Sequence, residues 1–339
     1  MKAGIIGYGV AGRYFHASSL RSAGFEVAAI CTRALERKAA AHQDFPNAIL
    51  VNSVEELLDE ELDLLVVAST NEVHVEHATA AINRGIATVV DKPVGLNYFE
   101  TLALFDLADL RGVSLTAFFN RLWDSDSLTI KKALQNEILG QPFRMESRYE
   151  RFRPELNINS WRETASPELG GGLLLDLQTH LISTALDWFG PAELVFSSLK
   201  EIRGGAEDDV SLILHHQNNV DSYLSASSIV GAPGPKLRVS GTKGSLVIKD
   251  LDQQEAHLRK GFLPKPGNWI NPAEITSEAR VHTGETSYNY PAVAGDYPKF
   301  YQLMKANLER GSALPVSREL ALNVAKIVDH ARELNIGGR

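Results

Sequence analysis

The sequence is poor in cysteine, in long apolar runs and in surplus basic residues, and each shortage excludes a class of protein. Cys31 is the single cysteine among 339 residues, so no intramolecular disulfide can form and no oxidising compartment is indicated. No apolar run is long enough to span a bilayer, and the first one ends in a glycine turn instead of a secretory signal. The formal net charge of −8 argues against nonspecific binding to nucleic acid or anionic membrane. We therefore expect a cytoplasmic protein that acts on a small molecule.

A glycine-rich turn comes directly after the first predicted strand, residues 2–6, and a helical pattern follows it. In this context the G-x-G-x-x-G pattern predicts a dinucleotide site. Gly7 permits the tight turn, Gly9 lets a pyrophosphate approach the backbone, and Gly12 lets the helix pack closely on the strand. The free N–H groups at the start of the helix then hold the phosphates. The predicted cofactor contacts are the whole run of Gly7, Tyr8, Gly9, Val10, Ala11 and Gly12.

The end of the second predicted strand, Glu26–Cys31, indicates which dinucleotide is bound. A site for NAD usually has an acidic residue there, which accepts a hydrogen bond from the ribose 2′-hydroxyl. Here Thr32 and Arg33 hold that place, and Arg37 and Lys38 follow about one turn further on. The predicted contacts are Thr32, Arg33 and Lys38. No carboxylate would repel a 2′-phosphate, and a guanidinium can bind it through two hydrogen bonds. We predict a preference for NADP; the alternative is that these are surface charges and that NAD is accepted as well.

Polar residues follow the fourth predicted strand, residues 62–68. Side chains at the carboxyl end of such a strand are suited to contacts with the ribose or the nicotinamide. The predicted contacts are Ser69, Thr70, Asn71 and, at the start of the next helix, His74. For His74 a purely structural hydrogen bond is the open alternative.

A lysine directly after a buried strand is the centre of the predicted site. The apolar run at residues 86–90 ends in Asp91-Lys92-Pro93, and Pro93 fixes the backbone beyond the lysine. Ligands of open α/β sheets bind at the carboxyl ends of the strands. We therefore expect Lys92 to lie where cofactor and substrate meet, although a lone lysine before a proline is more often a solvated loop residue.

The pattern of strands changes partway along the chain. Repeated strand–helix units predict a parallel, doubly wound sheet and a dinucleotide-binding domain over residues 1–121. Residues 122–339 contain longer, alternating strands such as 143–149, which predict a second α/β domain with a mostly antiparallel sheet. Residues 251–291 are rich in glycine, proline and polar residues and predict a long irregular excursion. We expect the C-terminal helices, among them 317–334, to pack back on the first domain.

A second group of polar residues follows three glycines, Gly170-Gly171-Gly172. Asp176 and His180 are four residues apart, so they share one face of the predicted helix. An imidazole so placed can exchange a proton near neutral pH, and the carboxylate can orient it or hold a substrate hydroxyl. The neighbouring leucines indicate a buried helix, and burial of both polar groups indicates a lined cavity. A structural hydrogen bond is the alternative; no third ligand at a recognisable spacing indicates a metal.

Two shorter stretches complete the predicted cleft. Asn120 and Arg121 follow the sixth predicted strand, and Trp161 and Arg162 pair a flat aromatic ring with a guanidinium upstream of the glycines. The second pair is suited to a cofactor phosphate or ring. The alternative is an anchoring tryptophan beside a surface ion pair.

These motifs and their order resemble the Gfo/Idh/MocA oxidoreductases, the relatives of glucose–fructose oxidoreductase and inositol dehydrogenase, over nearly the whole chain. The beginning, residues 7–17, looks most like the branch of NADP-dependent scyllo-inositol dehydrogenases. The resemblance implies an N-terminal Rossmann domain and a C-terminal domain with a large open-faced sheet, through which a homodimer or homotetramer forms. Asp91 stands where the family usually has glutamate, and Gln178 stands where it often has glycine, but neither departure removes a chemical group.

The resemblance also implies roles for single residues. Lys92 matches the lysine that contacts the nicotinamide ribose and the reacting hydroxyl, and His180 matches the catalytic histidine with Asp176 beside it. The residues that match positions lining the cofactor and substrate cleft are Asn120, Arg121, Trp161 and Arg162. Substrate contacts are expected from Lys92, Arg121, Asp176 and His180.

We therefore predict an NAD(P)-dependent oxidoreductase that transfers a hydride between nicotinamide and a secondary alcohol or ketone of a cyclic polyol or sugar. Two rivals share the fold: a non-catalytic, NAD(P)-binding sugar sensor, and a reductase similar to biliverdin reductase. A sensor has no need to keep Lys92, Asp176 and His180 together, so their joint presence favours the enzyme.

Overall fold

The computed structural model describes residues 1–335 and contains two sheets. The first is six-stranded and parallel, in the order β3-β2-β1-β4-β5-β6. Its strands are apolar and largely buried, as expected of a parallel sheet with helices on both faces. They are β1 (Lys2–Ile6), β2 (Glu26–Cys31), β3 (Ile49–Val51), β4 (Leu64–Val67), β5 (Ala87–Asp91) and β6 (Leu115–Phe118). This is the predicted doubly wound sheet, and the strand order reverses between β1 and β4, where such sheets bind ligands.

The connections of this sheet are mostly helical. They are η1 (Ala11–Ala17), α1 (Ser18–Ser22), α2 (Leu35–Asp44), α3 (Val54–Leu58), η2 (Asn71–Val73), α4 (His74–Asn83), α5 (Tyr98–Arg111) and η3 (Asn120–Trp123). Side-chain caps explain where two of them begin: Ser53 accepts a hydrogen bond from the Glu56 N–H, and Asn97 accepts one from the Glu100 N–H. α5 ends where Gly112 adopts a left-handed conformation with φ of 64°.

The second sheet has eight strands in the order β14-β13-β12-β11-β7-β10-β9-β8. Neighbouring strands are antiparallel except β7 and β10, which confirms the predicted mostly antiparallel sheet. The strands are β7 (Pro142–Glu150), β8 (Ala192–Lys200), β9 (Asp209–His216), β10 (Asp221–Ser227), β11 (Leu237–Gly241), β12 (Gly244–Ile248), β13 (Ala279–His282) and β14 (Ser287–Tyr290). Burial alternates along β9 and β10, so one face of this sheet is packed and the other is open.

The prediction of an irregular excursion over residues 251–291 is wrong. This segment contains the short helix α9 (Gln254–Arg259), the single turn η6 (Pro272–Glu274), and β13 and β14, which form a hairpin at the edge of the large sheet. Each of these strands has only four residues, too few for an alternating pattern to stand out from the surrounding polar residues. The hairpin extends the sheet, whereas α9 turns towards the first domain.

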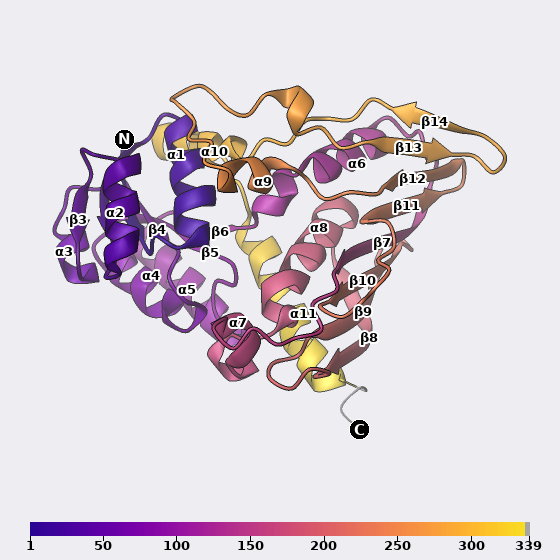
Figure 1. Cartoon of the computed structure of the whole chain (residues 1–339), viewed down its shortest axis with the longest axis horizontal. Coiled ribbons are helices and arrows are strands. Elements are labelled where there is room, and N and C mark those ends of the chain that lie inside the picture. Colours follow the sequence, from indigo (N-terminus) through magenta and orange to yellow (C-terminus); the bar gives the residue numbers. More distant parts are fainter. Residues whose placement is uncertain (336–339) are drawn as a thin grey trace.

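Most of the remaining helices lie on one face of the large sheet, between it and the parallel sheet, whereas α10 lies beside α1 (Figure 1). They are α6 (Ser125–Gln135), α7 (Trp161–Thr164), η4 (Pro167–Leu169), η5 (Leu174–Gln178), α8 (Thr179–Phe189), α10 (Pro298–Arg310) and α11 (Arg318–Leu334). Within residues 1–335, no helix has the length and apolar character needed to cross a membrane.

The last two helices pack against elements around the parallel sheet, and α11 also contacts the large sheet. α10 packs on α1, and α11 contacts α5 as well as α8 and β8. The Thr116 hydroxyl of β6 donates a hydrogen bond to the Val316 carbonyl at 2.9 Å. His16 Nδ1 and the Tyr301 hydroxyl are 2.6 Å apart and both buried. The end of the chain therefore contributes to the core beside the parallel sheet.

Candidate active site

A cavity of about 910 Å³ lies between the carboxyl edge of the parallel sheet and the helices that cover the large sheet. Lys92 lines it from the loop after β5, Asp176 from η5 and His180 from α8. The structure thus brings together the three residues predicted to be catalytic. The other predicted site residues that line this cavity are Val10, Ala11, Asp91, Asn120, Arg121 and Arg162.

The loop that carries Lys92 is held by a buried histidine. His74 donates a hydrogen bond from Nδ1 to the Pro93 carbonyl at 2.7 Å, and its Nε2 is 3.3 Å from the Ser69 carbonyl. Burial lowers the pKa of His74 below its ordinary value, so the ring is uncharged. Both ring nitrogens face backbone carbonyls, which is the structural alternative considered for this residue.

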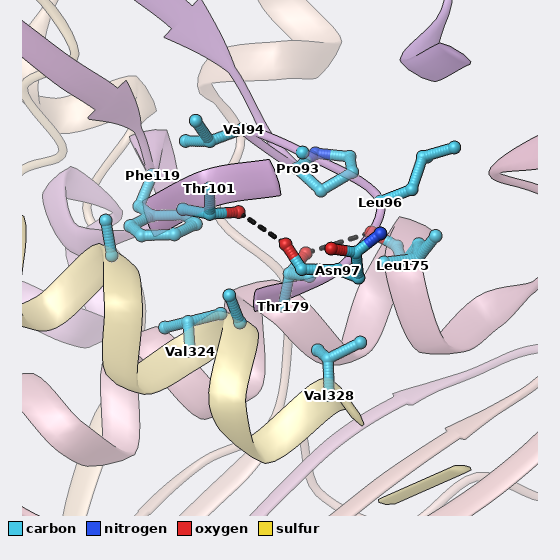
Figure 2. Close-up of a pocket in the computed structure, with 13 residues that line it drawn as sticks. Pro93, Val94, Leu96, Asn97, Thr101, Phe119, Leu175, Thr179, Val324 and Val328 are labelled. Atoms are coloured by element: carbon cyan, nitrogen blue, oxygen red, sulfur yellow. Dashed lines mark hydrogen bonds between the residues drawn. The ribbon is translucent and has the colours of Figure 1, made fainter. Parts of the chain in front are cut away.

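The same loop is supported from below by α11. A small apolar cavity of about 20 Å³ lies behind the loop. Figure 2 shows Val324 and Val328 of α11 on one side of this space and Pro93 on the other. The Arg332 guanidinium donates a hydrogen bond to the Leu96 carbonyl at 2.9 Å. Helix α11 therefore helps to hold the loop that carries Lys92 in position.

The Lys92 ammonium is bound to one residue at two points. Its Nζ donates to the Asp176 carbonyl at 2.5 Å and to Asp176 Oδ1 at 3.0 Å. Arg162 Nε is 3.3 Å from the same carboxylate oxygen. Burial alone would raise the pKa of Asp176, but Lys92 and Arg162 hold it below its ordinary value, so the carboxylate stays charged. Asp176 lies in the π-helical turn η5, a feature that is frequent at functional sites.

His180 is buried and uncharged. Burial lowers its pKa well below the ordinary value, and the nearby cations Lys92, Arg121 and Lys236 lower it further. Its Nδ1 is buried and has no hydrogen-bond partner among residues 1–335. Over the same residues no hydrogen bond joins it to Asp176, because that carboxylate is taken up by two cations. The imidazole is therefore free to meet a ligand in the cavity.

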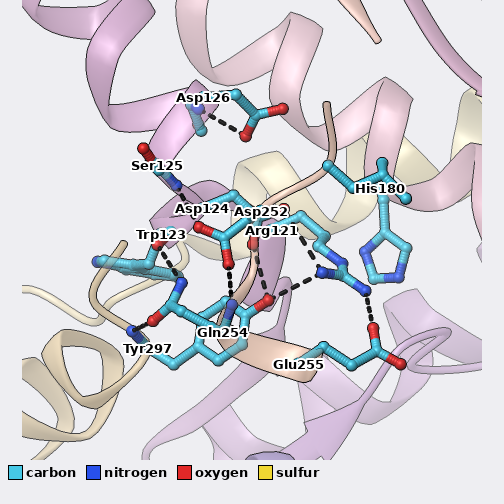
Figure 3. Close-up of polar contacts among 12 residues, drawn as sticks. Arg121, Trp123, Asp124, Ser125, Asp126, His180, Asp252, Gln254, Glu255 and Tyr297 are labelled. Carbon is cyan, nitrogen blue, oxygen red and sulfur yellow. Dashed lines mark hydrogen bonds and ion pairs between the residues drawn. The ribbon is translucent and has the colours of Figure 1, made fainter. Parts of the chain in front are cut away.

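Arg121 is fixed in a network of acidic and phenolic groups beside His180 (Figure 3). Its guanidinium donates to the Tyr297 hydroxyl at 2.8 Å and to Glu255 Oε2 at 2.5 Å. The Tyr297 hydroxyl in turn donates to Asp124 Oδ1 at 2.8 Å. Two donors of Arg121 are thus directed at protein groups, whereas its buried Nε has no partner among the described residues. Its charge lowers the pKa of the neighbouring His180.

The glycine loop has the shape that a dinucleotide needs. Gly7 has φ of 91°, and a Cβ there would lie 2.4 Å from the Ala68 carbonyl oxygen. A Cβ on Gly12 would lie 1.9 Å from the Gly7 carbonyl oxygen. A Cβ on Gly9 would meet nothing closer than the end of Arg37, at 3.9 Å. The first two glycines therefore allow close packing, and the space at Gly9 fits a phosphate.

A second feature also fits a bound cofactor. The side-chain Nδ2 of Asn120 is buried and has no hydrogen-bond partner among the described residues, although Asn120 lines the cavity. A buried amide without a partner is costly unless a ligand meets it. Together with the glycine loop, this amide makes the site suitable for a nicotinamide dinucleotide.

The residues predicted to select the cofactor lie together at the end of β2. Arg33 Nε donates to the Asn52 carbonyl at 3.2 Å, and the Lys38 ammonium contacts the Asn52 side-chain oxygen. Thr32 is buried beneath them. Arg37, which was noted beside Lys38 but not predicted as a contact, points its guanidinium at the glycine loop from the same edge. Its position depends on how α2 packs, which no local pattern indicates.

The polar residues after β4 contact protein groups. Ser69 Oγ is 3.0 Å from His77 Nδ1, and the Thr70 hydroxyl donates to Glu72. Asn71 donates from Nδ2 to the Gly170 carbonyl at 2.9 Å. None of these predicted cofactor contacts lines the large cavity. Asn71 instead connects the parallel sheet to the glycines that precede Asp176.

Four further residues named in the sequence analysis have side chains that contact protein groups. The Tyr8 side chain is buried and donates to Asp44 at 2.9 Å, so only its backbone remains on the glycine loop. Trp161 lies outside the cavity wall, with the Arg162 guanidinium 4.5 Å above its ring. Asp91 accepts a hydrogen bond from the Lys92 N–H at 2.8 Å. Gln178 donates to the Val210 carbonyl at 3.0 Å, so it contacts the large sheet.

Several cavity residues were not found from the sequence. The Lys236 ammonium is 4.3 Å from the centre of the Tyr149 ring and 3.3 Å from Asp126 Oδ2. Burial raises the pKa of Tyr149 to about 12, so this phenol keeps its proton. Tyr149 stands near the end of the first alternating strand, which was a usable signal, but no motif surrounds Lys236. Among the described residues, no three His, Cys, Asp or Glu side chains are grouped so as to hold a metal ion.

Glu207 supports the segment that carries Asp176. Its Oε1 accepts a hydrogen bond from the Leu174 N–H at 3.2 Å, and a Cβ on Gly172 would lie 2.1 Å from the same oxygen. Burial raises the pKa of Glu207 to about 7, and its Oε2 has no partner among residues 1–335. The folded state therefore favours the protonated form of this carboxyl group.

We expect Glu207→Gln to remove a pH-dependent loss of stability. Because the folded-state pKa of about 7 lies above the ordinary 4.5, the wild-type protein loses stability as pH rises between these values. The variant should gain up to about 3 kcal/mol relative to wild type between pH 5 and pH 8.5, measured by urea unfolding. Glu309→Gln, on an exposed glutamate near the end of α10, should show no such gain. An equal gain at both pH values in Glu207→Gln would contradict the assignment.

A parallel sheet with a dinucleotide motif, facing a buried lysine–aspartate pair and an uncharged histidine, defines a nicotinamide-dependent oxidoreductase. Residues 1–119 match the family described as oxidoreductase family, NAD-binding Rossmann fold, and residues 127–247 match the GFO/IDH/MocA C-terminal domain. The chain belongs to the Gfo/Idh/MocA family of NAD(P)-binding oxidoreductases, as its motifs predicted.

Individual relatives agree with this assignment. The chain is 32% identical to the scyllo-inositol 2-dehydrogenase (NADP(+)) IolW of Bacillus subtilis, over 98% of this chain and 93% of that protein. It is 26% identical to the 1,5-anhydro-D-fructose reductase of Ensifer adhaerens, over 86% and 90%. The solved structure of YvaA from Bacillus subtilis superposes with a TM-score of 0.88 at 30% identity, over 100% and 98% of the two chains.

Proposed function

We propose that the enzyme oxidises a secondary alcohol of a cyclic polyol or sugar, or reduces the corresponding ketone, with NADP as the preferred cofactor. The observation that carries this proposal is the Lys92–Asp176 pair, which shares one cavity with His180 and with the start of the glycine-loop helix. Relatives named as acting on scyllo-inositol and 1,5-anhydro-D-fructose support a polyol or sugar substrate.

In this proposal each residue has a separate role. The nicotinamide supplies the acceptor or donor of the hydride. Lys92 directs an ammonium hydrogen at the reacting oxygen and polarises it. His180, being uncharged, takes the hydroxyl proton during oxidation. Asp176 acts as a positioning residue, because its backbone carbonyl and its carboxylate Oδ1 hold the lysine in place.

A substrate screen tests the proposed function. The purified enzyme would be mixed with inositols, aldoses and keto-sugars and with each cofactor, and the absorbance of the reduced nicotinamide followed. We expect turnover with at least one cyclic polyol or sugar, at a higher rate with NADP(H). If no polyol or sugar is turned over but a tetrapyrrole is reduced with stoichiometric consumption of the cofactor, the rival reductase would be favoured.

The preference for NADP is expected to depend on Arg33. Its guanidinium lies at the end of β2 with one hydrogen bond to a backbone carbonyl, which leaves donors for a 2′-phosphate. A hydrogen bond to a charged group contributes about 1.5–3 kcal/mol. Arg33→Ala should therefore lower the ratio of kcat/KM for NADP over NAD by about 10–100-fold. Arg111→Ala, on an exposed arginine at the end of α5, should leave the ratio unchanged; an unchanged ratio in Arg33→Ala would refute the assignment.

We also propose a homodimer or homotetramer formed through the open face of the large sheet. The strand register places Tyr223, Ile213 and Phe196 side by side on three neighbouring strands of that face. Tyr223→Arg should shift the protein towards monomers in sedimentation velocity, since a charge in such an interface is unpaired. Phe99→Arg, an exposed aromatic on α5, is the control. An unchanged sedimentation coefficient for Tyr223→Arg would argue against this interface.

A further inference from the structure

The wall of the large cavity carries more positive than negative side chains. Nine lysines and arginines and seven aspartates and glutamates line it, although the whole chain has a formal charge of −8. Most of these cations pair with acids of the protein, as Lys92 and Arg162 do with Asp176. Over residues 1–335, no ion pair or hydrogen bond engages the side chains of the cavity residues Arg151, Arg153 and Lys249.

Arg151 is the most constrained of these three. It directly follows β7, and its Nε is buried without a hydrogen-bond partner in the described chain. Burial opposes the charge of its guanidinium and lowers its pKa, and repulsion from Arg153 adds to this. The acids near it are already engaged: Asp176 is held by two other cations, and Glu163 is 3.0 Å from the Arg203 guanidinium. A partly desolvated charge without a counter-ion is unfavourable unless a ligand supplies one.

We propose that the substrate carries an anionic group, a carboxylate or a phosphate, on a carbon other than the reacting one, and that Arg151 binds this group. The inference rests on the proposed function, because it adds a chemical feature to the substrate of the same cavity. A guanidinium binds both kinds of group through two parallel hydrogen bonds. Arg153 and Lys249, both exposed at the cavity, add a positive potential that attracts an anion.

The position of Arg151 is compatible with this role. It shares its surroundings with Asp176, the residue that holds Lys92, so the anionic group would lie near the reacting end of the cavity. Lys92 itself is neutralised by Asp176 and is directed at the reacting oxygen. The two cations are therefore separated in function: Lys92 acts on the reacting oxygen and Arg151 binds the acid group.

The kinetic test compares neutral and acidic forms of the same sugar. The probes are D-glucose, D-glucuronate and D-glucose 6-phosphate, together with myo-inositol and its 1-phosphate. We expect kcat/KM of wild type to be at least about tenfold higher for an acidic probe than for its neutral counterpart. Arg151→Met should lower kcat/KM for that acid by about 10–100-fold, mainly through KM, and leave the neutral sugar unchanged. The preferred probe distinguishes a carboxylate from a phosphate.

Two further variants serve as a control and as a conservative replacement in this comparison. Arg310→Met removes an exposed arginine at the end of α10, outside the cavity, and should have no effect on either class of probe. Arg151→Lys keeps the charge but loses the two-point geometry, so it should retain part of the preference for the acid. The lysine variant also provides a result if the methionine variant fails to fold.

A binding measurement separates this inference from the proposed function. The same probes would be titrated into the complex with NADPH and followed by calorimetry. If acidic probes bind through Arg151 but no sugar or polyol is turned over, the proposed function fails and the anion site stands. Equal affinity of wild type for acidic and neutral probes, or undiminished acid binding by Arg151→Met, would overturn the inference. Loss of NADPH affinity in Arg151→Met would also overturn it, since the guanidinium would then belong to the cofactor site.

Discussion

Lys92→Met is expected to lower kcat by about 10²–10⁴-fold, the range typical of losing one group that acts on the reacting atoms. The ammonium is the only group of the Lys92–Asp176 pair that can donate a hydrogen bond to a substrate oxygen. Affinity for NADPH should change by no more than a few-fold, because the glycine loop and the end of β2 remain intact. The measurement is steady-state turnover with the best substrate of the screen, alongside NADPH binding by fluorescence.

The control for this prediction is Lys243→Met, on an exposed lysine in the β11–β12 turn. It should keep full activity. Asp176 retains Arg162 as a partner in the Lys92 variant, so the folded state should survive with a modest loss in Tm. Turnover within tenfold of wild type would show that the lysine does not act on the reacting oxygen.

His180→Gln is expected to lower the rate of alcohol oxidation by about 10²–10⁴-fold, because glutamine cannot accept the hydroxyl proton. In wild type the oxidation rate should stay high as the pH falls to 6.5 and should decline only below it. The reason is that burial and neighbouring cations hold the pKa of His180 well below its ordinary value, so the imidazole stays uncharged. The profile of kcat/KM between pH 4.5 and pH 8.5 measures this directly.

Lys236→Met tests the cause of that shift. Removing one of the three cations favours the imidazolium, so the pKa of His180 should rise and the acidic limb should move to higher pH. Asp126 loses its partner in this variant, so Tm is measured first. Lys260→Met, on an exposed lysine, should leave the profile unchanged. An acidic limb that stays in place in Lys236→Met would mean that it reports another group.

Much of the fold could be predicted because local signals agree with it. The six parallel strands stand out as short apolar runs between glycine and polar turns, and Glu26–Cys31 was predicted with the bounds that the structure has. β13 and β14 were missed because four residues do not establish an alternating pattern. What fixes them is pairing with β12, a contact that only the folded sheet provides.

The site was predicted less completely, for a related reason. The sequence placed Asp176 and His180 on one helical segment but could not tell which of them meets Lys92, because that lysine is 84 residues from Asp176. Arg151 and Lys236 stand in no motif, and their surroundings come from strands far apart in the chain. Residue types and spacing predict which groups are available, whereas the pairing of charges depends on tertiary packing.

The buried contact between His16 and Tyr301 has a consequence for biosynthesis. The parallel sheet is made from the first third of the chain, yet the aromatic cluster beside it includes Phe300, whose ring centre is 4.8 Å from that of Phe118. A ribosome releases the N-terminal residues long before those of α10. The cofactor-binding half therefore exposes this apolar surface until α10 has emerged from the ribosome.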